Sequence, residues 1–311
     1  MTSLINELHA IYLQRYAPPN WIINFFESHE YIKYAKNVVC YSTKNNKAEI
    51  YKLITHRQPV NISMHAYYDT IKMAQIFGFD GSISGYTELF NNTQKMPPNL
   101  GIYCYTPVII PDSKTIYYRH VFNSIGIALD DRNQPDYKFL FDKDELKPSS
   151  KEIISNRLEE SYMYLLACAE QNNLSKIAIC HLGGGAFSRL YPGGSLDYLN
   201  DIWLPTVTRT INNHGGFLNE IRLLGANNDT ALQDLKSKLI LSNVVFGGRV
   251  PFDIVGEDSK DILFQNAWDP HSIAGNGNSS DNSLDGFFGR STAISVLTFP
   301  QTNPYLSHQT I

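Results

Sequence analysis

Apolar and polar positions alternate regularly from about residue 117 onward, and the pattern predicts strands and helices in turn. A short apolar run at 120–129, ended by two aspartates, predicts a buried strand. Similar runs predict further strands at 176–181, 220–224, 244–246 and 262–266. Between them, apolar residues spaced three or four apart predict helices at 150–172, 196–213 and 230–239. Strands that alternate with helices across short loops are typical of an α/β fold, in which a parallel or mixed sheet is covered on both faces.

The predicted helix at 150–172 carries the clearest signals. Ser149 and Glu152 have the spacing of a capping box, which favours a helix start. Behind them, helical spacing predicts one buried face made of Ile154, Leu158, Ser161, Leu165 and Cys168 or Ala169. We expect Asn172 and Asn173 to end the helix.

The first 115 residues are less regular. They predict a helix at 65–77 and an extended run at 100–110, and residues 1–60 contain no cluster of residues typical of a site. We therefore expect a helical or mixed N-terminal extension over 1–115, packed on a core domain over 116–311. The charged segment 142–151 is the one candidate boundary within the core, and we expect it to precede a helix instead.

Composition disfavours several classes of protein. Of the 311 residues, 43% are hydrophobic and 18% are charged, and the formal net charge is -4. A nucleic-acid binder needs clustered Lys and Arg to neutralise phosphates, so we expect no nucleic acid as a partner. We also expect no membrane partner, because no stretch reaches the ~18–20 apolar residues of a membrane span. The N-terminus lacks the pattern of a signal peptide. These features predict a cytoplasmic protein, and they leave open its export by a bacterium into a host cytosol.

The cysteines favour neither a metal site nor a disulfide framework. Cys40, Cys104, Cys168 and Cys180 include no Cys-x-x-Cys pair. The last two stand in apolar segments, where a cysteine is usually a small core residue. We expect no metal and no cofactor, and a reducing compartment fits this cysteine usage.

A glycine-rich loop follows the predicted strand at 176–181. Gly183, Gly184 and Gly185 lead into Ala186 and Phe187, so a strand, a glycine loop and a helix come in succession. In this arrangement backbone N–H groups converge on an anion, and glycines let the main chain approach a phosphate without obstruction by Cβ. Neither Lys-Ser nor Lys-Thr follows, which argues against a nucleoside-triphosphate P-loop. The alternative is a tight turn that requires positive φ.

A long polar loop follows the predicted strand at 262–266. The strand leads through Asn266 and Ala267 into a segment that contains Asp269, Gly275, Asn276, Gly277, Asp281 and Asp285. A loop this long and polar is more often functional than idle. Two aspartates beside a flexible Gly/Asn loop suit a site that positions a water molecule, although Asp in the first turn of a helix is also a common cap.

Both segments resemble parts of the macrodomain family. The strand and loop at 177–187 are similar to the family's second phosphate loop, where an apolar strand runs into Gly-x-Gly-[Ala/Ile/Val]-Phe. Asn266-Ala267 and Gly275-Asn276-Gly277 are similar to its Asn-Ala-x-Asn strand end and first glycine loop. In ordinary macrodomains the Asn-Ala segment comes first. Here it follows the phosphate loop by about eighty residues, which a circular permutation explains.

The resemblance covers roughly residues 117–299 and includes departures from the family pattern. Trp268 and Asp269 follow Ala267, so the second Asn of the strand-end motif is replaced. The first loop is Gly-Asn-Gly rather than Gly-Gly-Gly. The Gln-Glu-Glu motif of poly-ADP-ribose glycohydrolases is absent, so no catalytic glutamate is carried over. A permuted order with Asp-rich loops is most similar to the MavL-type macrodomain effectors of Legionella, a group known for removing ADP-ribose from ubiquitin.

The resemblance implies a three-layer αβα macrodomain-like fold with a mixed, circularly permuted sheet. It implies that the protein binds ADP-ribose and hydrolyses it from a modified protein, with ubiquitin as a candidate. The diphosphate is expected between 183–187 and 275–278, with Phe187 stacked on the distal ribose. Asp253, in an Asp-Ile pair similar to the family's, is expected at the adenine amino group, and Asn266 at the distal ribose.

A glycosidic bond at the distal ribose breaks through an oxocarbenium-like state, which a carboxylate can stabilise while it activates water. Asp281 and Asp285 are the first candidates for this carboxylate, and Asp269 is the next.

Other interpretations remain open at this stage. The main rival is an ADP-ribose reader without catalysis, because both glycine loops serve binding alone. An oxidoreductase that uses a nicotinamide dinucleotide predicts Gly-x-Gly-x-x-Gly after a first strand, and this spacing is missing. His181, just before the glycine loop, is either a hydrogen-bonded core histidine or a catalytic one. Asn266 could equally be a buried residue that satisfies neighbouring backbone.

Overall fold

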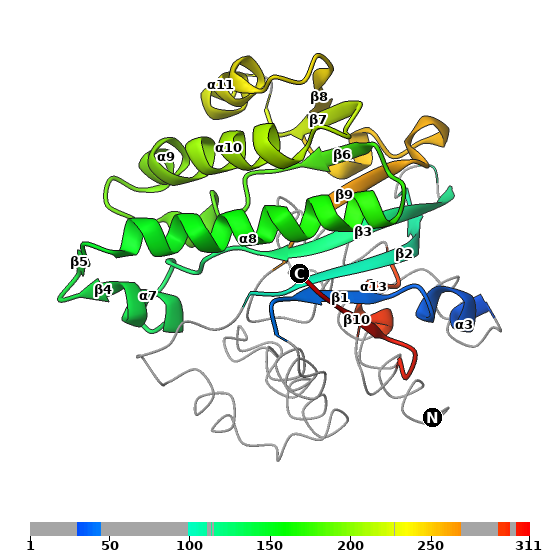
Figure 1. Ribbon diagram of the computed structural model, residues 1–311, viewed down its shortest axis with the longest axis horizontal. Helices are drawn as coiled ribbons and strands as arrows, with labels where there is room; N and C mark the ends of the chain where they lie inside the picture. The colour runs from blue at the N-terminus through cyan, green and yellow to red at the C-terminus, as the bar shows by residue number, and fades with distance from the viewer. Residues whose placement is uncertain are drawn as a thin grey trace.

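The computed structural model describes residues 30–44, 99–110, 113, 115–226, 228–268, 292–298 and 303–311. In this part of the chain, eight strands form one mixed sheet in the order β10-β1-β2-β3-β9-β6-β7-β8 (Figure 1). The strands are β1 (Val39–Ser42), β2 (Gly101–Ile109), β3 (Ile116–Ile125), β6 (Lys176–Ile179), β7 (Glu220–Leu224), β8 (Val244–Gly248), β9 (Ile262–Trp268) and β10 (Ser307–Thr310). The predicted α/β class with a mixed sheet is confirmed.

The direction of the strands decides which loops meet. Neighbouring strands run parallel from β3 through β9, β6 and β7 to β8. β2 is antiparallel to both β3 and β1, and β10 pairs with β1 in parallel. The carboxyl ends of β3, β9, β6, β7 and β8 therefore lie along one edge of the sheet.

Helices cover both faces of this sheet. On one face α8 (Ser150–Gln171) and α10 (Leu204–His214) lie side by side (Figure 1), and α11 (Thr230–Lys238) joins the same buried cluster. On the other face, α3 (Glu30–Ala35) and α13 (Ile294–Leu297) contribute to a second cluster. Along the central strands, side chains alternate between the two clusters. In β9, for example, Leu263 belongs to the first cluster and Phe264 to the second. The arrangement is compatible with a three-layer αβα fold.

The long helix α8 confirms the prediction at 150–172, but its start differs from the one expected. Ser149 makes no side-chain capping bond, so the predicted capping box does not form. Instead the Ser150 hydroxyl donates to the Leu140 carbonyl oxygen at 2.7 Å. This bond ties the start of α8 to the end of α7 (Pro135–Leu140), and the two-stranded hairpin of β4 (Phe141–Asp142) and β5 (Glu145–Leu146) lies between them.

The single helix predicted at 196–213 is wrong in detail. The structure has a short helix α9 (Ser195–Tyr198), a π-helical turn η3 (Leu199–Trp203) and then α10. Pro205 lies in the first turn of α10 and has no N–H to donate to the carbonyl four residues earlier. The N–H of Leu204 bonds the Leu199 carbonyl oxygen across five residues, which is the π-helical pattern.

The strand predicted at 120–129 is displaced. β3 starts at Ile116 and ends at Ile125, so residues 126–129 form no strand. A Cβ added at Gly126 would lie 2.8 Å from the Cα of Gly183, which shows how closely two backbone segments approach there. The chain must leave the sheet at this point to make that contact.

Two segments of the predicted N-terminal extension supply strands to the sheet. β1 pairs with β2, and β2 pairs with β3 along nine residues, which confirms the extended run predicted at 100–110. The helix predicted at 65–77 lies outside the described residues.

Cys168 and Cys180 are buried in the core as expected. Among the helices that the structure describes, none has the length and apolar character needed to cross a membrane.

Candidate functional site

The loops that leave the carboxyl edge of the parallel strands form the candidate site. β3 is followed by the segment 126–130, β6 by the glycine loop at 182–187, and β8 by a turn that contains Asp253. The segment after β9 begins at residue 269. In open α/β sheets, ligands bind in crevices outside the carboxyl ends of the strands. The structure therefore brings together at one edge the glycine loop, Asn266 and Asp253.

The glycine loop has a conformation that depends on its first two glycines. Gly183 has φ +75°, in the left-handed region that favours glycine. A Cβ added at Gly184 would lie 2.5 Å from the Leu199 side chain. The Gly184 N–H donates to the His181 carbonyl oxygen at 3.0 Å and so closes the turn after β6. The tight turn that the sequence offered as an alternative is thus present, and the loop continues beyond it.

The end of this loop presents three backbone N–H groups. Within the described part of the chain, the N–H groups of Gly185, Ala186 and Phe187 donate no hydrogen bond. Gly185 and Ala186 are exposed, and Phe187 is half-buried. The opposite side of this backbone is fixed, because the hydroxyl groups of Ser188 and Ser195 both donate to the Gly185 carbonyl oxygen at 3.0 Å. A segment with free N–H groups and a restrained carbonyl suits an anion.

The segment 126–130 after β3 holds the glycine loop in place. The Leu129 N–H donates to the Phe187 carbonyl oxygen at 2.6 Å, and the Leu190 N–H donates to the Leu129 carbonyl oxygen at 3.0 Å. The Arg189 side chain adds a bond from Nε to the Asp130 carbonyl oxygen at 2.6 Å. Sequence analysis treated Asp130 only as one of the two aspartates that end the apolar run at 120–129, and it missed this role. Gly126, a glycine within the apolar run at 120–129, was the available signal.

Asn266 is fully buried in β9 near its carboxyl end. Its Nδ2 donates to Oδ1 of Asn123 in the neighbouring strand β3 at 2.7 Å. Its Oδ1 has no hydrogen-bond partner among the described residues. Buried amide oxygens are usually hydrogen-bonded, so this one is available to a polar group of a ligand. The partner found is another side chain rather than the neighbouring backbone that the sequence suggested.

Asp253 lies on the turn after β8, where its carboxylate already has a structural role. Oδ2 accepts the backbone N–H groups of Arg249 at 2.6 Å and Val250 at 3.0 Å. The side chain is exposed, so its second oxygen can reach solvent. β7 separates β8 from β6, which places the ends of these strands roughly 10 Å apart. The contact with adenine stays a prediction.

His181, between β6 and the glycine loop, is held mainly by packing. Its ring lies edge-on to Trp203 with the centroids 4.7 Å apart, and its side chain is 17% exposed. Nε2 is 3.5 Å from Oδ1 of Asp229, too far for a good hydrogen bond. Burial lowers the pKa of His181, and the nearby Asp229 carboxylate opposes this shift. The geometry favours a packed histidine.

A buried polar network lies beneath this edge, close to β6. The Tyr162 hydroxyl donates to the Cys180 carbonyl oxygen at 3.0 Å and accepts the indole N–H of Trp203 at 3.1 Å. The Gln265 side-chain oxygen accepts the Cys180 N–H at 3.2 Å. These bonds satisfy the backbone of residue 180 on both sides, so the chain can leave β6 without an unpaired buried group.

The remaining predicted site residues lie outside the described part of the chain. They are the candidate carboxylates and the second glycine loop, namely Asp269, Gly275, Asn276, Gly277, Asp281 and Asp285. Among the described residues, no group of three His, Cys, Asp or Glu side chains could hold a metal ion. The chain matches no known family model, and a search of curated proteins finds no significant relative.

Proposed function

We propose that this protein is a circularly permuted macrodomain that binds ADP-ribose and hydrolyses it from a modified protein. The observation that carries the proposal is the adjacency of β6 and β9. Parallel pairing of Lys176 with Ile262 and of Ala178 with Phe264 makes both strands leave the sheet at the same edge. The two segments that resemble macrodomain phosphate loops are about eighty residues apart in sequence, yet they begin side by side.

The chemistry of this edge supports a diphosphate as the bound group. The N–H groups of Gly185, Ala186 and Phe187 offer donors without a cluster of basic side chains. Such donors suit a ligand whose charge lies in a pyrophosphate, because backbone amides approach it closely where glycine removes the Cβ. Oδ1 of Asn266, which has no hydrogen-bond partner among the described residues, supports a polar ligand at the neighbouring strand end. Ribose hydroxyl groups are donors that could satisfy it.

The proposed reaction breaks the bond between the anomeric carbon of the distal ribose and the acceptor atom of the protein. A water molecule supplies the new bond to that carbon. A carboxylate takes one proton from this water, and the carboxylic acid so formed returns a proton to the departing acceptor. Asp281, Asp285 and Asp269 are the candidates for the carboxylate. One such carboxylate can both stabilise the oxocarbenium-like state and remove the proton from water.

A binding experiment tests the first half of the proposal. ADP-ribose is titrated into the full chain by calorimetry, and wild type is compared with Ala186→Pro and Ala186→Ser. Proline removes one N–H without breaking a hydrogen bond among the described residues, whereas serine keeps the N–H at the same exposed position. We expect the proline variant to bind roughly tenfold more weakly and the serine variant to match wild type. Equal affinities in all three proteins would contradict the role of the glycine loop.

A release experiment tests the second half. ADP-ribosylated ubiquitin is incubated with wild type and with Asp281→Ala, Asp285→Ala and Asp269→Ala, and freed ADP-ribose is measured over time. Loss of the true base should slow release by about 10²–10⁴-fold while ADP-ribose affinity is largely kept. If wild type binds ADP-ribose but releases none from any modified protein offered, the chain is a reader.

A further inference from the structure

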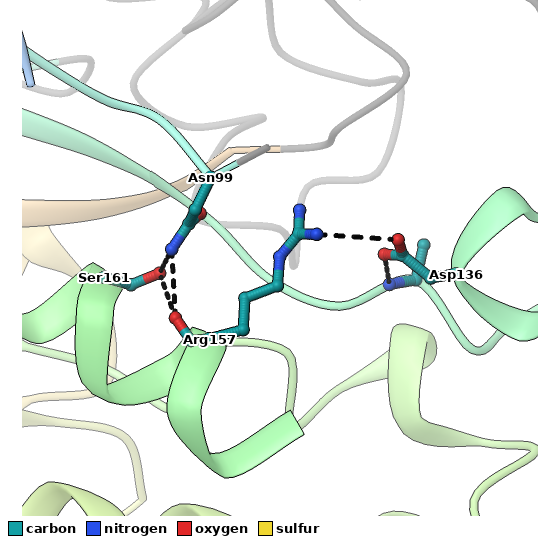
Figure 2. A network of polar contacts seen from close by, with 5 residues as sticks. Asn99, Asp136, Arg157 and Ser161 are labelled. Atoms are coloured by element: carbon teal, nitrogen blue, oxygen red, sulfur yellow. Dashed lines mark hydrogen bonds and ion pairs between the residues drawn. The ribbon is translucent and has the colours of Figure 1, made fainter. Parts of the chain in front are cut away.

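Asp136, in the first turn of α7, is a buried carboxylate that touches the backbone beneath the candidate site. The residue is 4% exposed. Its Oδ2 accepts the Ala128 N–H at 3.0 Å (Figure 2). Ala128 belongs to the segment 126–130 that follows β3. A hydrogen bond from a backbone N–H to an ionised carboxylate is roughly twice as strong as one between neutral groups, so it fixes this segment firmly.

The segment that Asp136 fixes is the one that holds the glycine loop. Leu129, next to Ala128, both donates to the Phe187 carbonyl oxygen and accepts the Leu190 N–H. Gly126, two residues before Ala128, lies against Gly183. A shift of residues 126–129 would therefore move both ends of the glycine loop.

Arg157 of α8 supplies the countercharge for Asp136. Its Nη1 lies 3.8 Å from Oδ1 of Asp136, and the two side chains are 7% and 5% exposed (Figure 2). This distance is too long for a hydrogen bond, and Oδ1 has no other hydrogen-bond partner among the described residues. Asn99 holds the turn of α8 that carries Arg157, because its Nδ2 donates to the Arg157 carbonyl oxygen at 2.9 Å. Asp136 is thus an ion-paired carboxylate whose hydrogen bond goes to the loop segment.

We propose that Asp136 is a positioning residue that, with Arg157, sets the conformation of the glycine loop and so presents its free N–H groups to the ligand. The part of this proposal that concerns the ligand rests on the proposed function. A buried ion pair adds little stability compared with apolar residues of the same volume. The hydrogen bond between Asp136 and the segment that holds the glycine loop accounts for the presence of the ion pair at this position.

Two variants separate the charge from the hydrogen bond. Asp136→Asn keeps an oxygen that can accept the Ala128 N–H but removes the charge that faces Arg157. Asp136→Ala removes both. Ser259→Ala is the matched control, because Ser259 is also fully buried and accepts a bond from a buried arginine, Arg119 Nε, at 2.7 Å. Ser259 precedes β9 and lies at the opposite, amino edge of the parallel strands.

Hydrogen–deuterium exchange of the ligand-free protein is the first readout. In peptides that contain residues 126–130 and 183–190, we expect exchange to be about tenfold faster in Asp136→Ala and less accelerated in Asp136→Asn. Ser259→Ala should leave these peptides at wild-type rates. Calorimetry with ADP-ribose is the second readout, and affinity should fall by roughly tenfold in Asp136→Ala and by less than twofold in Ser259→Ala.

The two readouts distinguish failure of this proposal from failure of the proposed function. Wild-type exchange rates in both Asp136 variants would overturn the positioning role, whatever the ligand. Selective loss of protection with unchanged ADP-ribose affinity would overturn its link to binding. If wild type fails to bind ADP-ribose while the Asp136 variants still lose protection selectively, Asp136 sets the loop and the proposed ligand is wrong. Asp136→Asn carries the experiment if Asp136→Ala does not fold.

Discussion

The contact between Gly126 and Gly183 gives the sharpest prediction about the site. In Gly126→Ala, the new Cβ would lie 2.8 Å from Cα and 2.9 Å from N of Gly183. Both atoms belong to the backbone, so no side-chain rotation can relieve the clash. One of the two segments must move. Over-packing of this kind destabilises proteins by about 1–3 kcal/mol.

The expected effect can be measured by thermal unfolding without ligand. For a domain of this size, each kcal/mol lowers the Tm by about 2–4 °C, so Gly126→Ala should lose roughly 2–12 °C. Gly183→Ala should also be destabilised, by about 1–2 kcal/mol, because φ +75° is unfavourable for alanine. Gly216→Ala is the control, since a Cβ there meets no atom within 4 Å.

The Tm values of these variants test whether residues 126 and 183 are in contact. If Gly126→Ala unfolds at the temperature of wild type and of Gly216→Ala, residues 126 and 183 do not lie against each other. The account of how the segment after β3 holds the glycine loop would then be refuted. In the double variant, the two losses should not add, because residues 126 and 183 are in contact and a shift that relieves one substitution also affects the other.

Three further predictions concern groups around the sheet. Asn266→Ala removes the donor to Asn123 Oδ1, and the acceptor left unpaired should lower the free energy of unfolding in urea by about 1–3 kcal/mol. An unchanged urea midpoint would show that the Asn266–Asn123 hydrogen bond is not formed. Burial, and then the charge of Arg119, lowers the pKa of His120 to about 4. Between these pH values the unfolded chain binds a proton that the folded protein does not, so the free energy of unfolding should fall from pH 6.5 towards pH 4. It should fall less in His120→Gln, and parallel pH profiles of the two proteins would contradict this. Tyr162→Phe removes the hydroxyl bonded to the Cys180 carbonyl oxygen and should also destabilise the fold by about 1–3 kcal/mol, with a Tm equal to that of wild type as the contrary result.

Some features of the candidate site could be read from the sequence, and others could not. The glycine loop was recognisable because three glycines follow an apolar run. Asp136 was not recognisable, because an aspartate directly after proline is typical of an exposed residue at a helix start. Its burial depends on Arg157, which comes 21 positions later on another helix. A charged pair of this kind is visible only once the two helices are packed.

The sequence by itself determined the local elements. Apolar periodicity is a property of neighbouring residues, so it located α8, β6, β7 and β9 almost to the residue, and it indicated helices on both faces of a sheet. It failed where an element's end depends on a distant partner. β3 stops at Ile125 because Gly126 meets Gly183. The pattern also missed a local irregularity, the π-helical turn at Leu199–Trp203 within the helix predicted at 196–213.

Only the tertiary structure decided which elements are neighbours. The order of the strands places β9 between β3 and β6, although about eighty residues separate β9 from β6 along the chain. Pairing between distant strands depends on how the whole sheet buries its two faces, and no local pattern encodes that choice. The shared edge at which the glycine loop, Asn266 and Asp253 meet follows from that order.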